Sequence, residues 1–436
     1  MPPPQKSIKP RDRDTIVQAL GAGVVPRIGL HHLQVGRALE VEALVKDIAR
    51  ISDGGSTFRF IIGEYGAGKT FFLNLVRAIA LEKRLVTVHA DLGPHHRLHG
   101  TNSQARLLYS ETIKNMATRS KADGALESLV EVFITRAQDE AEKSNQKRDD
   151  VIRTKLATLR EHTGGFDFAT VISAYLKGWE NGDDELKANA IRWLRGEFTT
   201  KTEAKNALGV RDIVTDASIY SQWKLIAQFA RLAGYNGLLV VLDEMVNIYK
   251  LQNSKARESN YEQLLRILND ALQGQSSPLG FVAGGTPEFL RDQRRGVFSY
   301  SALQTRLAEN SFVSGSLVDV SGPVINLQNL TREELYVLLE NIRNIFAGGD
   351  DKKHLVPDEA LKAFMQRCET RLGDSYFRTP RTTVKQFVNF LSVLEQNKQT
   401  DWRNLLGDIT PEQDQAPTLT DIVDEDDDEL TAIKLK

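Results

Sequence analysis

The sequence predicts an α/β fold built on a parallel sheet, with a large helical insertion and a C-terminal helical lid. Residues 58–62 form a short β-rich run, and a glycine-rich loop and an apolar helix over 71–79 follow it. Residues 84–90 then have the pattern of a buried strand. Strand, loop, helix and strand in this order are typical of a βαβ unit in a parallel sheet.

The chain after this unit is first helical and then returns to strands. Residues 91–236 have helical periodicity and almost no strand signal, which favours a helical insertion over a very long loop. Strands are expected at 237–242, 279–284 and 324–327, with a helix over 261–272. Thr331 and Glu334 form a capping box that opens the C-terminal helical region.

These elements divide the chain into five expected parts. They are a flexible N-terminal arm over 1–14, an α/β domain over 15–100 and 236–328 that contains the glycine-rich loop, a helical insertion over 101–235, a helical lid over 329–404, and an acidic, disordered tail over 405–436.

Composition excludes several classes of protein. The net charge of −2 argues against a strongly basic nucleic-acid binder and leaves only a local basic patch to consider. The single cysteine, Cys368, excludes a disulfide framework. The first residues lack the apolar core of a signal peptide, and no apolar run reaches the roughly 18 residues of a membrane span. We therefore expect a cytoplasmic protein with no membrane partner.

The glycine-rich loop has a complete G-x-x-x-x-G-K-[ST] pattern over 63–70. Its glycines allow backbone N–H groups to point at phosphate oxygens, and the positive end of the following helix adds to this. Lys69 is expected to reach the β- and γ-phosphates, and the Thr70 hydroxyl to bind Mg²⁺. A chance glycine turn would lack the flanking strand and helix. The cofactors expected are ATP and Mg²⁺, and the expected nucleotide-binding residues of the loop are Gly63, Glu64, Tyr65, Gly66, Ala67, Gly68, Lys69, Thr70 and Phe71.

Two carboxylates follow the apolar strand 237–242. Asp243 and Glu244 stand at its carboxyl end, where α/β sheets bind ligands. Asp243 is expected to hold Mg²⁺, and Glu244 to activate the attacking water as general base. The alternative is that the two carboxylates form a solvated acidic turn. The phosphate-binding loop disfavours this alternative, because it needs a partner that holds the metal ion. A lone aspartate would suit a GTPase or a kinase equally well, whereas the pair favours ATP hydrolysis.

Together these motifs resemble those of AAA+ ATPases. Gly36-Arg37 resembles the Gly-Arg box that lines the adenine side in origin-recognition-like and STAND relatives. The resemblance implies that Thr286 is the sensor 1 residue near the γ-phosphate. It also implies that Arg381, or else Arg378, is the sensor 2 arginine of the lid.

A narrower resemblance rests on the stretches 23–30, 35–37, 58–70 and 295–307. These are similar to the ATP-binding, BrxD-like proteins of bacterial BREX-type anti-phage systems, and the likeness extends over residues 15–400. It implies a role beside a helicase, methyltransferase or nuclease partner in defence against phage.

AAA+ rings complete each site with an arginine from the neighbouring subunit. The resemblance therefore implies a homo-oligomer, with Arg306 and Arg295 ahead of Arg291 and Arg294 as candidates. The alternative is that this basic cluster is a solvated face or contacts the phosphates of nucleic acid.

Four histidines at 89, 95, 96 and 99 surround Asp91. Their spacing matches no known zinc motif, so polar contacts are favoured over a metal site.

Three functions remain open from the sequence. One is an oligomeric ATPase that remodels or loads a partner on DNA. Another is a STAND-like switch set by ATP binding, and the last is an ATP-gated scaffold that does not touch DNA.

Overall fold

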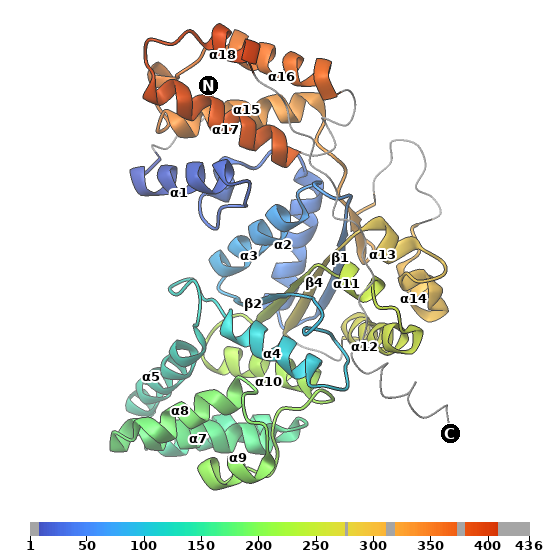
Figure 1. The fold of residues 1–436 in the computed structure, drawn as a ribbon. Helices are drawn as coiled ribbons and strands as arrows, with labels where there is room; N and C mark the ends of the chain where they lie inside the picture. Colours follow the sequence, from blue (N-terminus) through green and yellow to red (C-terminus); the bar gives the residue numbers. More distant parts are fainter. Residues whose placement is uncertain (1–7, 275–277, 311–318, 373–379, 409–436) are drawn as a thin grey trace, which may run out of the picture. The chain divides into compact units, whose positions relative to one another are not determined.

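A computed structural model describes residues 8–274, 278–310, 319–372 and 380–408, and it confirms the α/β class (Figure 1). The five-stranded sheet has the order β2-β3-β4-β1-β5. The pairs β2–β3 and β3–β4 are parallel, with Val86 opposite Leu238 and Leu238 opposite Leu279. The strands are β1 (Thr57–Ile62), β2 (Val86–Asp91), β3 (Leu238–Asp243), β4 (Leu279–Gly285) and β5 (Val324–Asn326).

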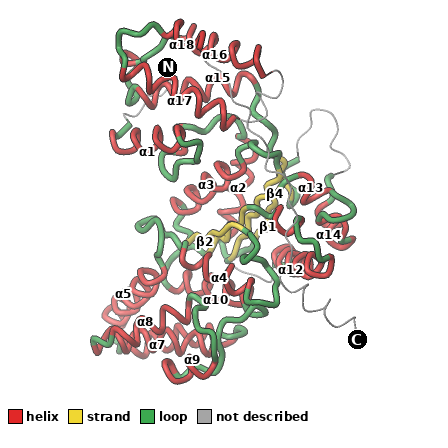
Figure 2. The backbone as a smooth tube through the Cα atoms, viewed as in Figure 1, coloured by secondary structure: helices red, strands yellow, loops and turns green. Residues whose placement is uncertain are grey.

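The neighbouring inner strands β3 and β4 are buried along their whole length. Their continuous apolar sequences suit strands that are covered on both faces, as parallel strands are. Figure 2 shows strands that are far apart in the sequence lying together, while helices and loops form the rest of the described residues. All five strands expected from the sequence are present, each within three residues of its expected ends.

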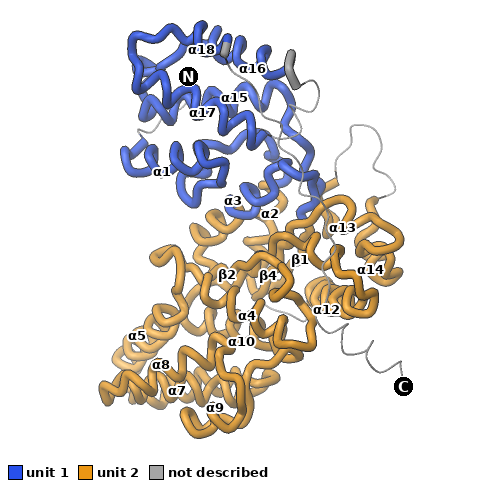
Figure 3. Tube along the Cα trace, viewed as in Figure 1, with its two compact units in different colours: residues 1–40, 61–75, 326–418 blue, residues 41–60, 76–325, 419–436 orange. Residues whose placement is uncertain are grey.

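The chain forms two compact units, which Figure 3 colours separately. Unit 1 comprises residues 1–40, 61–75 and 326–418, and unit 2 comprises 41–60, 76–325 and 419–436. The division passes through β1, β5 and the helices α2 (Ala38–Ser52) and α3 (Lys69–Glu82). Each unit has its own apolar core.

Unit 1 is a helical bundle that also contains the phosphate-binding loop. Ile16, Leu339, Phe364 and Phe387 are fully buried in its core. The capping box expected at Thr331 and Glu334 is confirmed at the start of α15. The bundle contains α1 (Pro10–Gly21), η1 (Leu30–His32), α15 (Arg332–Phe346), η4 (Asp351–Lys353), α16 (Asp358–Leu372), α17 (Pro380–Gln396) and α18 (Trp402–Asp408). Since α1 begins at Pro10, the last residues of the expected flexible arm are helical.

Unit 2 carries the helices between β2 and β3. They are α4 (Gln104–Lys114), α5 (Leu126–Ser144), α6 (Arg148–Ala157), η2 (Thr158–Glu161), α7 (Gly165–Asn181), α8 (Asp184–Leu194), α9 (Lys201–Leu208) and α10 (Ile219–Leu232). Helix α9 is short and charged, and the side chain of its N-cap, Thr200, accepts from the Glu203 amide. Asp167 ties α7 to the chain after α9, because its carboxylate accepts from the amides of Arg211 and Asp212 at 2.9 and 3.0 Å.

The remaining helices of unit 2 follow β3 and β4. They are α11 (Val246–Tyr249), α12 (Ser254–Leu272), α13 (Pro287–Arg291), η3 (Val297–Ser299) and α14 (Ser301–Leu307). Helix α12 begins earlier than the apolar pattern predicts, because the Asn253 side chain caps its first turn.

An aromatic cluster joins the helical part of unit 2 to the sheet. The rings of Trp223 on α10 and Phe281 on β4 lie edge to face, with centroids 5.6 Å apart. The Trp223 indole N–H donates to the Thr112 hydroxyl at 3.1 Å, so its one polar group is satisfied inside the core.

In the described ranges, no helix combines the length and the apolar character needed to cross a membrane.

Candidate nucleotide-binding site

The phosphate-binding loop lies in unit 1, where it joins the end of β1 to α3. Gly66 and Gly68 have φ values of 79° and 81°, in the left-handed region that favours glycine. The amide of Ala67 donates to the Glu64 carbonyl at 3.1 Å and closes a tight turn. Helix α3 begins at Lys69, so the loop ends at the positive pole of a helix.

Lys69 lies across this turn. Its ammonium donates to the carbonyls of Gly63 and Glu64 at 2.8 and 3.0 Å. Thr70, the second residue of α3, is exposed. Phe71 packs its side chain against the core of unit 1, so its backbone amide is the group that fits a role in phosphate binding.

Arg37 braces the loop from the side. Its guanidinium donates to the Ala67 carbonyl and lies over the Phe72 ring, 5.9 Å from the centroid. Burial lowers the pKa of Arg37, while the carboxylates of Glu40 and Glu334 oppose that shift. An arginine remains charged despite such a shift, so Arg37 adds a fixed positive charge beside the loop.

Gly36 is close to the capping box of α15. It has a φ of 60°, and a Cβ atom at this position would overlap the Glu334 carboxylate. That carboxylate accepts from the Thr331 amide at 2.9 Å. The Gly-Arg pair therefore links the phosphate-binding loop to the first turn of α15.

Arg381 connects the loop to the start of α17. Its Nε donates to the Gly23 carbonyl at 2.6 Å, and its Nη1 lies 3.4 Å from the Tyr65 hydroxyl. Arg378, the second sensor 2 candidate, lies outside the described residues. Lys69, Arg37 and Arg381 thus give one loop of unit 1 three positive side chains, which suits a polyphosphate.

The acidic pair lies in unit 2, at the carboxyl end of β3. Asp243 is only 8% exposed, and its carboxylate accepts from the Glu244 amide at 2.8 Å. Glu244 has a φ of 57°, which is uncommon for a residue other than glycine. Backbone strain of this kind is often found at functional sites.

Asp91 is a neighbour that sequence reasoning did not connect to this site. It is the partner of Asp243 across the β2–β3 pairing. Burial raises the pKa of Asp91, and the charges of Asp243 and Glu111 raise it further. Two adjacent carboxylates with an unfavourable mutual charge form a donor set that fits a hard divalent cation such as Mg²⁺.

The described residues contain no group of three or more His, Cys, Asp and Glu side chains placed to hold a metal ion. The pair Asp91 and Asp243 therefore needs further oxygen donors, such as phosphate and water, to complete a Mg²⁺ site.

The other candidates are positioned by local contacts in unit 2. The Thr286 hydroxyl accepts from the Phe289 amide at 3.4 Å and so caps α13. Arg295 is half-buried, lies over the Tyr249 ring at 5.4 Å and donates to the Leu251 carbonyl at 3.2 Å. Arg306 is exposed on α14, and its Nε donates to the Asn269 side chain at 2.6 Å.

The phosphate-binding loop and the acidic strand end belong to different compact units.

A parallel α/β sheet, a glycine-rich loop closed by a lysine and the helix that follows define a P-loop nucleotide-binding protein. The chain belongs to the family of BREX system ATP-binding proteins BrxC/D, whose family model matches residues 8–410. This confirms the resemblance drawn from the sequence motifs. No curated protein matches the sequence significantly. Family membership gives the protein an ATP-binding role in BREX antiviral defence, with other components of that system as partners.

Proposed function

We propose that the protein binds ATP with Mg²⁺, hydrolyses it, and acts as a homo-oligomer beside a helicase or other DNA-processing partner, in contact with DNA. The observation that carries this proposal is the phosphate-binding loop of unit 1. Lys69 spans its turn, Arg37 donates to Ala67, and Arg381 reaches Tyr65.

Binding of the nucleotide follows from these contacts. The backbone N–H groups of residues 64–70 and the start of α3 hold phosphate oxygens, and Lys69 exchanges its carbonyl partners for the β- and γ-phosphates. Arg37 keeps the loop in shape through the Ala67 carbonyl. Gly36 and Arg37 also stand on the adenine side of the nucleotide in this proposal. Arg381 adds positive charge from α17.

Hydrolysis is assigned to the carboxylates at the end of β3. Asp243, together with the Thr70 hydroxyl, would hold Mg²⁺, which when bound neutralises the charge that develops on the phosphates. Glu244 accepts the proton of the attacking water as general base. Thr286 orients the water or the γ-phosphate from the end of β4. Asp91 adds negative charge that strengthens retention of the cation.

A trans-acting arginine would complete the reaction in an oligomer. Arg295 is half-buried and lies over the Tyr249 ring, whereas Arg306 is exposed on α14, where it donates to Asn269. The proposal therefore assigns the finger to Arg306.

Calorimetric titration with Mg-ATP tests the binding half of this proposal. We expect the wild-type protein to bind one ATP per chain and Lys69→Ala to lose most of the affinity. Lys83→Ala, which removes an exposed charge beyond the end of α3, should bind as wild type does. Equal affinity in Lys69→Ala and wild type would contradict a role for the loop.

A second candidate is a switch that responds to ATP binding with little turnover. It is favoured by Arg381, which connects α17 to Tyr65 of the loop, so that the helical bundle can respond to nucleotide directly. A phage-plating assay with Glu244→Gln separates the two. Loss of protection supports hydrolysis, and retained protection supports the switch.

A further inference from the structure

We propose that a basic pocket at the amino ends of β2 and β3 is a second nucleotide-phosphate site, separate from the ATP loop. Asp91 and Asp243 mark the carboxyl ends of the same two strands, so the pocket lies at the other end of them. All of its residues belong to unit 2.

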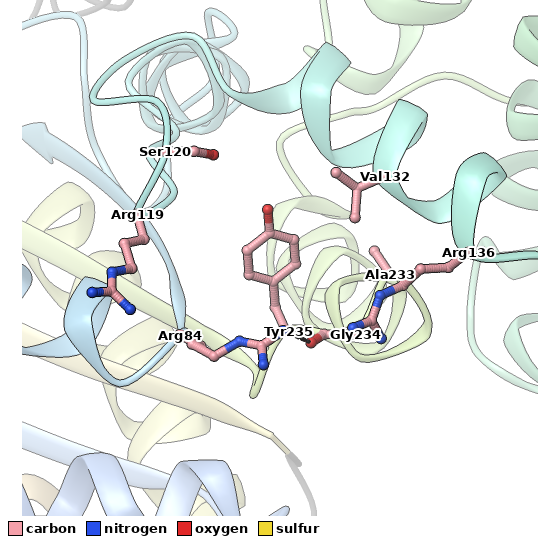
Figure 4. Close-up of a pocket in the computed structure, with 8 residues that line it drawn as sticks. All are labelled: Arg84, Arg119, Ser120, Val132, Arg136, Ala233, Gly234 and Tyr235. Carbon is pink, nitrogen blue, oxygen red and sulfur yellow. Dashed lines mark hydrogen bonds between the residues drawn. The ribbon is translucent and has the colours of Figure 1, made fainter. Parts of the chain in front are cut away.

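The pocket is a cavity of about 550 Å³. This falls within the range of small-molecule sites. Three arginines surround it, together with one hydroxyl side chain and one aromatic ring, as Figure 4 shows. Its lining residues are Arg84, Arg119, Ser120, Val132, Arg136, Ala233, Gly234 and Tyr235.

Two hydrogen-bonded turns form the floor of the pocket. Arg84 lies just before β2 with a φ of 62°, and its side chain donates to the Gly234 carbonyl at 3.3 Å. The Asn236 amide donates to the Arg84 carbonyl at 2.9 Å, and its side chain donates to the Lys83 carbonyl at 2.8 Å. The floor is therefore fixed by backbone contacts and does not depend on a ligand.

Arg136 approaches this floor from α5. Gly234 has a φ of 83°, and a Cβ atom there would overlap the Arg136 guanidinium. A glycine at this position thus lets the arginine come close to the turn. The positive charge of Arg136, on a helix of the insertion, therefore lies near the amino end of β3.

The positive charge of the pocket is only partly neutralised. Arg119 pairs with Glu82 at 3.3 Å, and both side chains are well exposed, at 63% and 68%. Exposed pairs of this kind are weak. Within the described part of the chain, Arg84 and Arg136 form no ion pair. The lining residues thus include three guanidinium groups and no carboxylate, a balance that favours an anion.

The remaining lining residues indicate which anion fits. Tyr235 stands between the arginines with its hydroxyl directed towards Ser120, as Figure 4 shows. Guanidinium groups bind phosphate oxygens through paired N–H donors. The Tyr235 ring, with Val132 and Ala233 beside it, offers an apolar surface that suits a base or a sugar. A nucleotide has both a phosphate group for the arginines and a base and sugar for the apolar surface, whereas inorganic phosphate has only the first.

The nucleotide unit that this pocket would bind can belong to a free nucleotide or to a nucleic-acid strand. The experiment therefore measures the binding of each kind of ligand separately. Both arms use Lys69→Ala protein, in which the phosphate-binding loop should no longer bind nucleotide. Any binding that remains is then independent of the proposed ATPase site, so failure of the proposed function does not affect the result. One arm measures fluorescence anisotropy of a labelled short single-stranded oligonucleotide, and the other measures calorimetric binding of AMP.

Arg136→Ala and Arg119→Ala are the test variants. Arg153→Ala, which removes an equally positive side chain that is 72% exposed on α6, is the matched control. We expect each test variant to weaken binding in one arm about tenfold, the effect of losing a charge-assisted contact. The control should change it little. For the oligonucleotide, the slope of log K against log salt should fall by about 0.7 per lost phosphate contact.

Arg136→Lys keeps the charge and should retain part of the affinity, which separates loss of the contact from loss of folding. A loss confined to the oligonucleotide arm assigns a nucleic-acid strand, and a loss confined to the AMP arm assigns a free nucleotide. Absence of binding in both arms, or equal affinity in Arg119→Ala, Arg136→Ala and Arg153→Ala, would overturn the proposal.

Discussion

The Arg381 guanidinium donates a 2.6 Å hydrogen bond to the Gly23 carbonyl. The same guanidinium lies 3.4 Å from the Tyr65 hydroxyl of the phosphate-binding loop. One side chain at the start of α17 therefore holds both the turn after α1 and the loop that binds phosphate. In the proposed function this arginine connects the nucleotide to the C-terminal helices.

Replacing Arg381 tests this connection. We expect Arg381→Ala to weaken ATP binding about tenfold, since it removes a positive charge and the contact that orders Tyr65. Arg381→Lys should recover only part of the affinity, because lysine cannot donate from two fixed positions. Lys362→Ala, at an exposed position on α16, is the control. Unchanged ATP affinity in Arg381→Ala, measured by calorimetry, would refute the connection.

Gly36 gives a prediction about stability. Gly36→Ala should lower the free energy of unfolding by about 1–3 kcal/mol through backbone strain, with a further loss because the new Cβ overlaps Glu334. Gly348→Ala is a matched control, since Gly348 has a similar φ of 66° and no atom within 4 Å of its Cβ position. Chemical denaturation of both variants measures the difference. If both variants lose the same free energy of unfolding, the overlap with Glu334 does not contribute to the destabilisation.

Asp91 gives a prediction about pH. Its pKa is raised in the folded protein, so ionisation costs stability at pH values above the unfolded pKa and costs nothing below it. Asp91→Asn should therefore raise the melting temperature near neutral pH and lose this advantage as the solution is acidified. Mg²⁺ should stabilise wild type more than Asp91→Asn.

Asp53→Asn, which removes an exposed carboxylate after α2, is the control for net charge. Thermal scans across a pH series, with and without Mg²⁺, provide the measurement. If Asp91→Asn and Asp53→Asn behave alike, Asp91 has no special relation to Asp243.

Arg306 gives a prediction about assembly. If it acts in a neighbouring subunit, ATPase activity should rise more steeply than linearly with protein concentration. Mixing Arg306→Ala with Lys69→Ala should restore activity, because each variant supplies the group that the other lacks. Arg294→Ala, from the same basic cluster, serves as the comparison. Activity that stays linear at all dilutions, with no rescue on mixing, would rule out Arg306 as a trans finger.

The sequence predicted features that depend on local patterns. The strands, the phosphate-binding loop and the Thr331–Glu334 capping box could be read from spacing alone, because short-range chemistry determines them. Asp91 could not, since only the register between β2 and β3 brings it beside Asp243. The contact of Arg37 with Ala67 and the grouping of Arg84, Arg119 and Arg136 likewise join residues distant in sequence. A carboxylate at the end of the second strand was the available signal for Asp91.

Steady-state phosphate release with Mg-ATP, comparing wild type with Glu244→Gln, tests the central claim most directly. The proposed general base predicts that Glu244→Gln retains ATP binding while its rate falls about 10²–10⁴-fold. The neutral side chain keeps its place on the strained backbone, so the loss would reflect chemistry. A Glu244→Gln protein that releases phosphate as fast as wild type would contradict the account.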